Sequence, residues 1–115
     1  MQFKMNDRIW EIQELTQEQM KERLKDNGEE PNEGRYYGLT FFNTQKIYID
    51  KDLCSGQKRQ TLMHELMHCY IGCYITTDNK EFCEEDVCNI SGNSHNIIHK
   101  IVSDYFNKFN QTPID

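Results

Sequence analysis

The chain has 115 residues, a length that suits one domain with a modest hydrophobic core, and we assign residues 1–115 to a single domain. The net charge of −6 argues against nucleic acids and anionic membranes as partners, because both require a basic face. No apolar run approaches the ~20 residues of a membrane span, and residues 1–7 lack the apolar core of a signal peptide. We therefore expect a cytoplasmic protein.

The first half of the sequence predicts strands around one short helix. Arg8–Ile12 contains Trp and Ile and is a candidate first strand. Thr16–Gln19 has the pattern of a capping box, which opens a helix. Tyr36–Phe42 and Lys46–Asp50 are β-prone segments on either side of a short turn, and the second alternates polar and apolar residues as a half-buried strand does. These two segments predict a β-hairpin.

The second half of the sequence predicts helices. Gln57–Ile75 is a long helix with an apolar side and no proline. A further helix is expected to begin near Glu81, and Ser91–Ser94 would either break it or merely weaken it. His95–Phe109 is helical again, because its apolar residues recur three and four positions apart. The predicted order is β-α-β-β-α-α-α, an α+β fold with a small antiparallel sheet whose hairpin packs on the long helix.

The long helix carries an H-E-x-x-H motif, residues 64–68. Residues four apart share one face of a helix, so His64 and His68 can present two imidazoles to one metal ion, and zinc suits such ligands. Glu65 lies about 100° further around the helix, where its carboxylate can act as general base on a metal-bound water. The motif therefore predicts two metal ligands and a catalytic base.

Catalytic zinc usually has three protein ligands and an open position, so the chain must supply a third ligand. We favour Glu85, because Asn89 lies four residues further on and its amide oxygen can accept a hydrogen bond from a ligand histidine. Glu84 is the alternative, and His95 or His99 would be another. These two histidines are four apart, but Asn follows the first of them in place of Glu. We expect them to form a solvated or partly buried face rather than a second metal site.

Five cysteines, an odd number, do not suggest a disulfide framework, and we expect free, buried thiols. Cys69 and Cys73 follow His68 on the long helix, so a structural zinc site with His and Cys ligands is an alternative. Four ligands on one straight helix cannot surround an ion tetrahedrally, which argues against that alternative.

These motifs resemble the ImmA/IrrE-like zinc metallopeptidases, and in particular their short members from Gram-positive bacteria, phages and mobile elements. The resemblance covers roughly residues 35–105. It is carried by Gly38-Leu39-Thr40, Ile47–Asp50, the H-E-L-M-H helix and a downstream E-x-x-[AC]-[ND] pattern. It implies a minimal zincin-like domain of the gluzincin type, in which His64, His68 and a downstream Glu bind one Zn²⁺ ion. Met67 stands where the family often has Gly, and the family's usual Phe-Ala is missing from the downstream helix.

The implied function is hydrolysis of peptide bonds, in which Glu65 takes a proton from the metal-activated water and returns it to the leaving amine. The partner would then be a protein or peptide, and Tyr36–Phe42 could receive it in extended form along the strand edge. Candidate donors to the oxyanion are Tyr36, Tyr37, Tyr70 and Tyr74. The alternative is a zinc-binding regulatory or interaction module of phage or mobile-element origin with little activity of its own, since so short a chain has few loops for specificity pockets.

Overall fold

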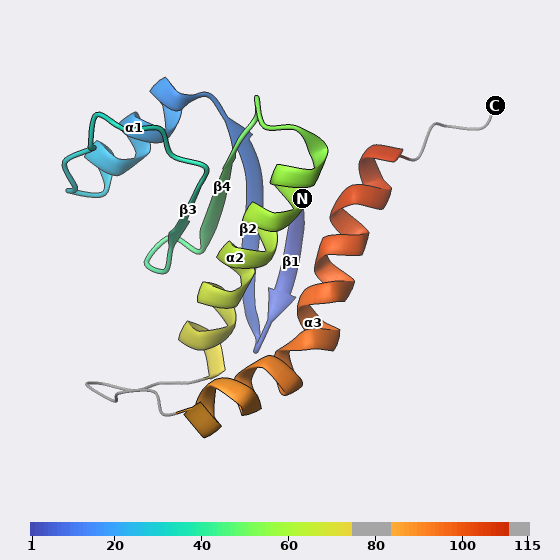
Figure 1. Cartoon of the computed structure of the whole chain (residues 1–115). Helices are drawn as coiled ribbons and strands as arrows, with labels where there is room; N and C mark the ends of the chain where they lie inside the picture. The colour runs from blue at the N-terminus through green and yellow to red at the C-terminus, as the bar shows by residue number, and fades with distance from the viewer. Residues whose placement is uncertain (75–83, 111–115) are drawn as a thin grey trace.

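A computed structural model of the chain describes the backbone of residues 1–74 and 84–110 and the side chains of residues 1–74 and 94–107. Its elements in chain order are β1 (Gln2–Met5), β2 (Arg8–Leu15), α1 (Gln17–Asp26), β3 (Gly38–Phe41), β4 (Lys46–Asp50), α2 (Ser55–Tyr74) and α3 (Glu84–Asn110). Figure 1 shows their arrangement. The predicted hairpin, the short helix and the long helix are confirmed. The structure differs from the prediction in an additional first strand, in the direction of the central strand pair and in a single C-terminal helix where two were predicted.

The strand β1 is missing from the predicted order, although its pattern alternates between buried and exposed residues. Phe3 and Met5 are buried, and the residues between and before them are exposed. β1 pairs with β2 through a turn formed by Asn6 and Asp7, whose φ angles are 48° and 62°. Asn and Asp tolerate positive φ better than other side chains, and a two-residue hairpin turn of this kind requires it twice. The Asn-Asp pair was thus a readable signal for this hairpin.

The four strands form one mixed sheet in the order β1-β2-β4-β3. β1 and β2 are antiparallel, as are β3 and β4, but the central pair β2 and β4 is parallel. The α+β class is therefore confirmed, whereas the expectation of a wholly antiparallel sheet is wrong. The reason is the connection between β2 and β4, which contains α1 and β3 and is long enough to return the chain to the same end of the sheet.

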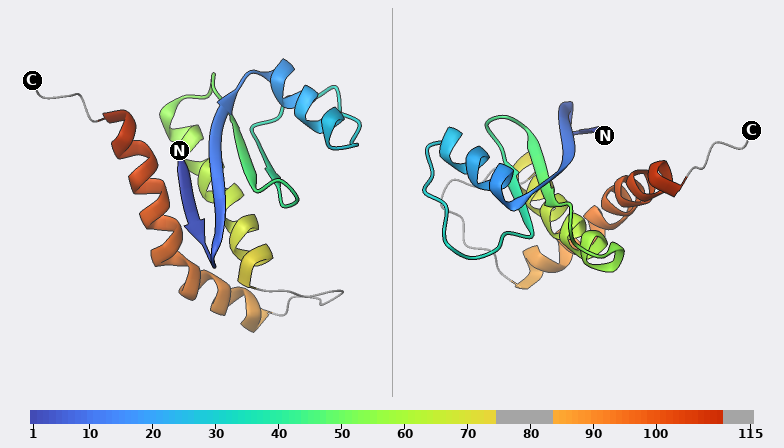
Figure 2. Two further views of the ribbon diagram at one scale, coloured as in Figure 1. Left: turned by 180° about the vertical axis from the view of Figure 1, so that it is seen from behind. Right: turned by 90° about the horizontal axis from the view of Figure 1, so that it is seen from above.

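Helices cover both faces of this sheet, with α1 on one face and α2 and α3 on the other (Figures 1 and 2). The larger core lies on the side of α2 and α3 and includes Ile47 and Ile49 of β4. The smaller core lies under α1 and includes Tyr48. β4 is consequently buried on both faces, not half-buried as predicted, because α1 covers the face that its polar pattern assigned to solvent.

α1 and α2 begin and end close to the predicted positions, whereas one helix, α3, replaces the two predicted after them. Thr16 caps α1 in a complete capping box, since its hydroxyl accepts from the Gln19 N–H and its own N–H donates to the Gln19 side chain. α2 begins at Ser55, two residues before the predicted start. α3 is continuous through Ser91–Ser94, although its axis bends in Figure 1, and the predicted start near Glu81 lies outside the described residues.

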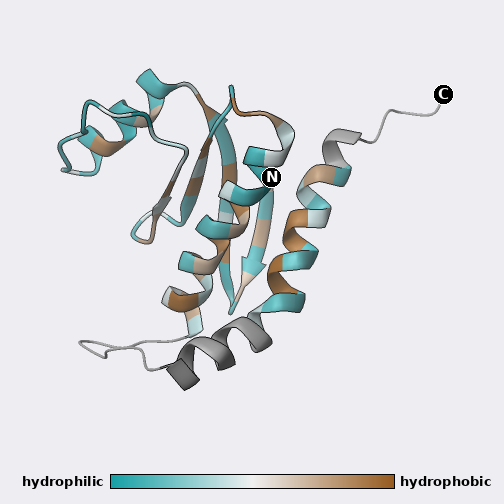
Figure 3. Cartoon of the chain, viewed as in Figure 1, coloured by the Kyte–Doolittle hydropathy of each residue, from teal (hydrophilic) through white to brown (hydrophobic). Residues whose placement is uncertain are grey.

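The apolar residues of α3 anchor it against the sheet and α2. Figure 3 shows them along the side of the helix that faces the rest of the molecule. The buried ones are Ile98, Ile101, Val102 and Tyr105. No helix in the described part of the chain is long and apolar enough to cross a membrane.

Candidate metal centre

The side of α2 that faces the sheet is apolar, and the opposite side is open to solvent. Leu62, Leu66 and Cys69 are fully buried, at the three- and four-residue spacing of one helical face. His64 and His68 lie away from this face and are exposed. The packing of α2 on the sheet therefore leaves both imidazoles available to a ligand.

The two histidines have the geometry of a metal-binding pair. The Nε2 atoms of His64 and His68 are 3.2 Å apart, and the ring planes are inclined by 84°. Two imidazole nitrogens bound tetrahedrally to zinc at about 2.0–2.1 Å would be about 3.3 Å apart. Together with Glu65, they are the described residues that group as potential metal ligands, with ligand atoms all within 4.8 Å of one another. The side chains thus fit one zinc-sized ion.

Glu65 differs from the histidines because β3 covers it. Its side chain is only 6% exposed, and its Oε1 atom accepts a hydrogen bond of 3.0 Å from the hydroxyl of Thr40 on β3. Gly38, also on β3, lies so close to α2 that an added Cβ would be 2.9 Å from the Glu65 Cγ atom. The strand therefore holds the carboxylate in one position beside the histidines. Sequence reasoning assigned neither Gly38 nor Thr40 a role, because nothing local links them to Glu65.

The cysteines of α2 lie on the other side of the helix. Cys69 and Cys73 are buried in the larger core, whereas His64 and His68 are exposed. Burial raises the pKa of the Cys69 thiol, which opposes the thiolate form that a metal requires. A structural zinc site with these ligands is thus incompatible with the fold. Cys54 is exposed, so the expectation that all cysteines are buried is wrong for it.

An open cleft of about 410 Å³ lies between α2 and the segment that leads into β3. Its lining includes Arg35, Tyr37, Gln60, Thr61, His64 and Glu65. A second cleft, of about 390 Å³, lies between α2 and α3 and shares His64 with the first. The candidate metal centre therefore stands at the junction of two clefts.

His95 and His99 line the second cleft together with Met63 and Met67. Both are exposed, and their rings are stacked with centroids 5.7 Å apart and planes inclined by 7°. They therefore form the solvated face that the sequence indicated, on the wall of a cleft. Neither belongs to the group of potential metal ligands found among the described side chains.

The four candidate tyrosines are placed differently. Tyr70 is buried, and the hydroxyl of Tyr74 accepts a hydrogen bond from the Asn6 N–H at 3.1 Å. Tyr36 and Tyr37 both line the first cleft. Tyr37 is 54% exposed, so its ring is accessible from the cleft.

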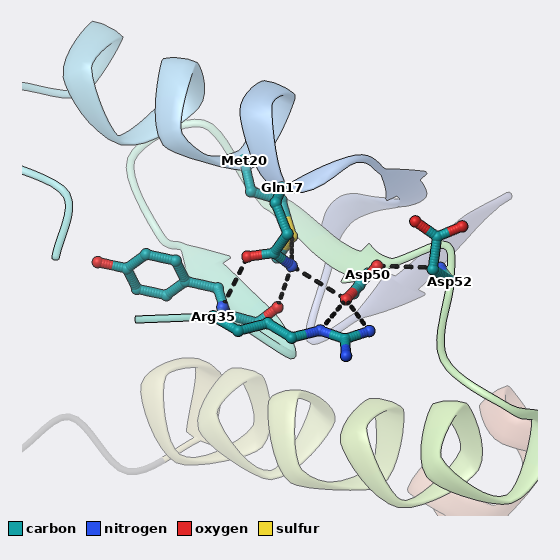
Figure 4. Close-up of polar contacts among 6 residues, drawn as sticks. Gln17, Met20, Arg35, Asp50 and Asp52 are labelled. Carbon is teal, nitrogen blue, oxygen red and sulfur yellow. Dashed lines mark hydrogen bonds and ion pairs between the residues drawn. The ribbon is translucent and has the colours of Figure 1, made fainter. Parts of the chain in front are cut away.

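A buried carboxylate, that of Asp50, is bound to Arg35, which lines the first cleft (Figure 4). Asp50, at the end of β4, is fully buried. Its Oδ2 atom accepts hydrogen bonds from Arg35 Nε at 2.8 Å and Gln17 Nε2 at 3.0 Å, and its Oδ1 atom accepts from the Asp52 N–H at 2.9 Å. Burial by itself would raise the pKa of Asp50, but the Asp52 N–H, Arg35 and Gln17 together hold that pKa below its usual value.

The same network holds the chain that enters β3. Gln17, on the first turn of α1, accepts a hydrogen bond of 2.8 Å from the Tyr36 N–H and donates one of 2.6 Å to the Tyr36 carbonyl. Asp50 donates its own N–H to the Tyr37 carbonyl at 2.9 Å. The residues that line the cleft are thus connected to both α1 and β4. Sequence reasoning missed this network, since a single Asp at a strand end gives no sign of its partners.

The predicted third ligand, Glu85 or Glu84, belongs to α3. α3 begins at Glu84, so Glu84, Glu85 and Asn89 belong to its first turns, but their side chains lie outside the described residues.

Comparison with known proteins places the chain in a family. The model of the IrrE N-terminal-like domain, peptidase M78, matches residues 12–90. The matched segment includes α1, β3, β4 and the whole of α2 with its H-E-x-x-H motif. No curated protein and no solved structure gives a significant match. The chain therefore belongs to the IrrE N-terminal-like family of metallopeptidases, peptidase family M78, as the resemblance of its motifs implied.

Proposed function

We propose that the chain is a zinc-dependent peptidase that hydrolyses peptide bonds with Glu65 as general base. The observation that carries this proposal is the geometry of the H-E-x-x-H residues. Two exposed imidazole nitrogens lie 3.2 Å apart, and a buried carboxylate lies next to them at the junction of two clefts.

A zinc ion bound by His64 and His68 would act as a Lewis acid that lowers the pKa of a water molecule and polarises the substrate carbonyl. Glu65 takes the proton from the attacking water and then donates it to the leaving amine. Thr40 fixes the carboxylate for both steps through its hydrogen bond to Oε1. Because the other carboxylate oxygen is not bonded to Thr40, it is the one we assign to proton transfer.

The third ligand is proposed to be Glu85, with Glu84 as the alternative. Both residues belong to the first turn of α3, and Asn89 follows on the second. We assign Asn89 the role of a hydrogen-bond acceptor for the free N–H of a ligand histidine, as metal-bound imidazoles usually have such a partner. A carboxylate third ligand would complete the set of two histidines and one acid that zinc peptidases use.

The substrate is proposed to be an extended protein or peptide segment. β3 is at one end of the strand order, so its outer edge can pair with an added strand. A chain on this edge would pass beside Glu65 and His64, because β3 and α2 flank the first cleft. The net charge of −6 favours such a partner over nucleic acids or anionic membranes.

The proposal is tested with zinc-loaded protein and a mixture of peptides, with new termini identified by mass spectrometry. Wild-type protein should cut, and Glu65→Gln should lose about 100-fold or more of the rate, as expected for a missing general base, while it retains zinc. Glu22→Gln on the exposed side of α1 makes the same change in charge and serves as control. Cleavage that survives Glu65→Gln would refute the assigned mechanism. The absence of cleavage in the presence of bound zinc would favour an interaction module.

A further inference from the structure

Arg35 is held in the first cleft by an arrangement that leaves part of its guanidinium unused. Its Nε and Nη2 atoms contact Asp50 Oδ2 at 2.8 Å and 2.7 Å. The guanidinium carbon lies 5.6 Å from the centre of the Tyr37 ring, a distance at which a cation is attracted to an aromatic face. The Nη1 atom has no hydrogen-bond or ion-pair partner among the described residues. One edge of the guanidinium is thus fixed, and the other remains a free donor.

The free edge is accessible from the cleft. The Arg35 side chain is 50% exposed, although the Asp50 side chain behind it is only 1% exposed. Arg35 lines the same cleft as Gln60, Thr61 and His64, so a molecule bound beside the candidate metal centre can reach it. In Figure 4 the Asp50–Arg35 pair lies above α2, the helix that supplies Gln60, Thr61 and His64 to the cleft.

Stability alone is a weak explanation for this pair. An ion pair with one buried carboxylate must offset the cost of removing that charge from water, and apolar residues often stabilise such positions equally well. Gln17 and the Asp52 N–H instead hold the Asp50 carboxylate in place through hydrogen bonds. Asp50 in turn holds one edge of the Arg35 guanidinium beside the cleft. A guanidinium that is already ordered loses less conformational freedom when it binds a ligand.

We propose that Arg35 is a specificity residue that binds a carboxylate of the substrate through its free edge. Planar guanidinium groups bind carboxylates in two parallel hydrogen bonds, which suits an acidic side chain or a C-terminal carboxylate equally. The substrate is then a peptide that carries a negative charge in the part that binds in the first cleft. This inference rests on the proposed peptidase function for its biological meaning, but the binding it describes does not require hydrolysis.

The binding is measured by NMR on ¹⁵N-labelled protein with two matched pairs of ligands. N-acetylglutamic acid α-amide is compared with N-acetylglutamine amide for an acidic side chain, and N-acetylalanine is compared with its amide for a C-terminal carboxylate. Because zinc itself binds carboxylates, each titration is repeated after chelator treatment. The acid should bind about 10- to 100-fold more tightly than its amide, as a charge-assisted pair of hydrogen bonds predicts. The Arg35 Nε–H signal and the amides of Gln60 and Thr61 should shift in both samples.

Variants then separate binding from structural support. Arg35→Gln should abolish the preference for the acid, and Arg35→Lys, which keeps the charge but loses the planar fork, should lose most of it. Arg8→Gln removes the same charge from the exposed first residue of β2 and should behave as wild type. Should Arg35→Gln fail to fold, the Arg35→Lys variant and the comparison of acid with amide on the wild-type protein still test the proposed carboxylate binding.

The two acids identify the source of the carboxylate. Tighter binding of N-acetylglutamic acid α-amide would indicate an acidic side chain, and tighter binding of N-acetylalanine would indicate a C-terminus. Equal affinity for each acid and its amide would overturn the inference, as would shifts confined to residues outside the cleft. Glu65-dependent cleavage without an acid preference would leave the proposed function in place and remove only this inference. An acid preference without any cleavage would support the proposed carboxylate site and argue against the proposed peptidase activity.

Discussion

Gly38→Ala should damage the candidate centre without touching a metal ligand. An added Cβ would lie 2.7 Å from Thr61 Cγ2 and 2.9 Å from Glu65 Cγ, so a separation of at least 3.4 Å requires a shift of roughly 0.7 Å. Thr61 is β-branched and stiff on its helix, and Glu65 is held by Thr40. Either β3 moves away from α2 or the carboxylate is displaced. Overpacking of this kind destabilises a protein by about 1–3 kcal/mol.

The effect on rate should exceed the effect on stability. A displacement of about 1 Å in the reacting groups can reduce a rate by about 100-fold. Zinc affinity should remain close to the wild-type value, because the atoms nearest to the added Cβ belong to Thr61 and Glu65 and not to the two histidines. Urea unfolding, chelator competition and peptide cleavage measure these three quantities separately. Gly34→Ala is the matched control, since nothing lies within 4 Å of its added Cβ. A Gly38→Ala protein with wild-type stability and rate would refute the reasoning.

Three further predictions concern the third ligand, the buried carboxylate and the helix–turn contact. Glu85→Ala should abolish zinc binding in a chelator titration, whereas Glu84→Ala should retain it, and the reverse result would assign the site to Glu84. Asp50→Asn should lower the free energy of unfolding at neutral pH by about 1.5–3 kcal/mol, the value of hydrogen bonds to a charged group. The pKa of Asp50 is lower in the folded protein than in the unfolded chain. The Asp50 carboxylate therefore contributes its full stabilisation of the fold above the unfolded pKa of about 3.9, and this contribution is lost as the pH falls through the folded pKa. Urea unfolding across this range should show the difference between the two proteins narrowing with acid, and a constant difference would contradict the assignment. Gly72→Ala should destabilise the protein, because its added Cβ would clash with the ring of Phe42. In a Phe42→Ala background the ring is absent, so Gly72→Ala should stabilise the protein by up to about 1 kcal/mol through the higher helix propensity of Ala. Thermal unfolding of the wild type, the two single variants and the double variant tests this.

The parts of this protein that the sequence determined by itself are those that depend on neighbours within a few residues. The capping box at Thr16 and Gln19 and the apolar side of α2 follow from local spacing, which a helix converts directly into shared faces. The approach of His64 to His68 follows for the same reason, because a four-residue separation on a helix brings two side chains together wherever that helix lies. The motif was therefore readable before the fold was known.

The tertiary structure decided the features that join segments distant in sequence. The parallel pairing of β2 with β4 depends on how the chain returns after α1, and a strand's own pattern does not encode its partner's direction. Glu65 is buried and oriented because β3, 25 residues earlier, crosses its helix at Gly38 and Thr40. Asp50 meets Gln17 and Arg35 only when α1, β4 and the segment before β3 converge. Such contacts arise from the packing of elements against one another, for which no local periodicity exists. Only the folded chain therefore reveals how the Glu65 carboxylate is held and what lines the cleft beside it.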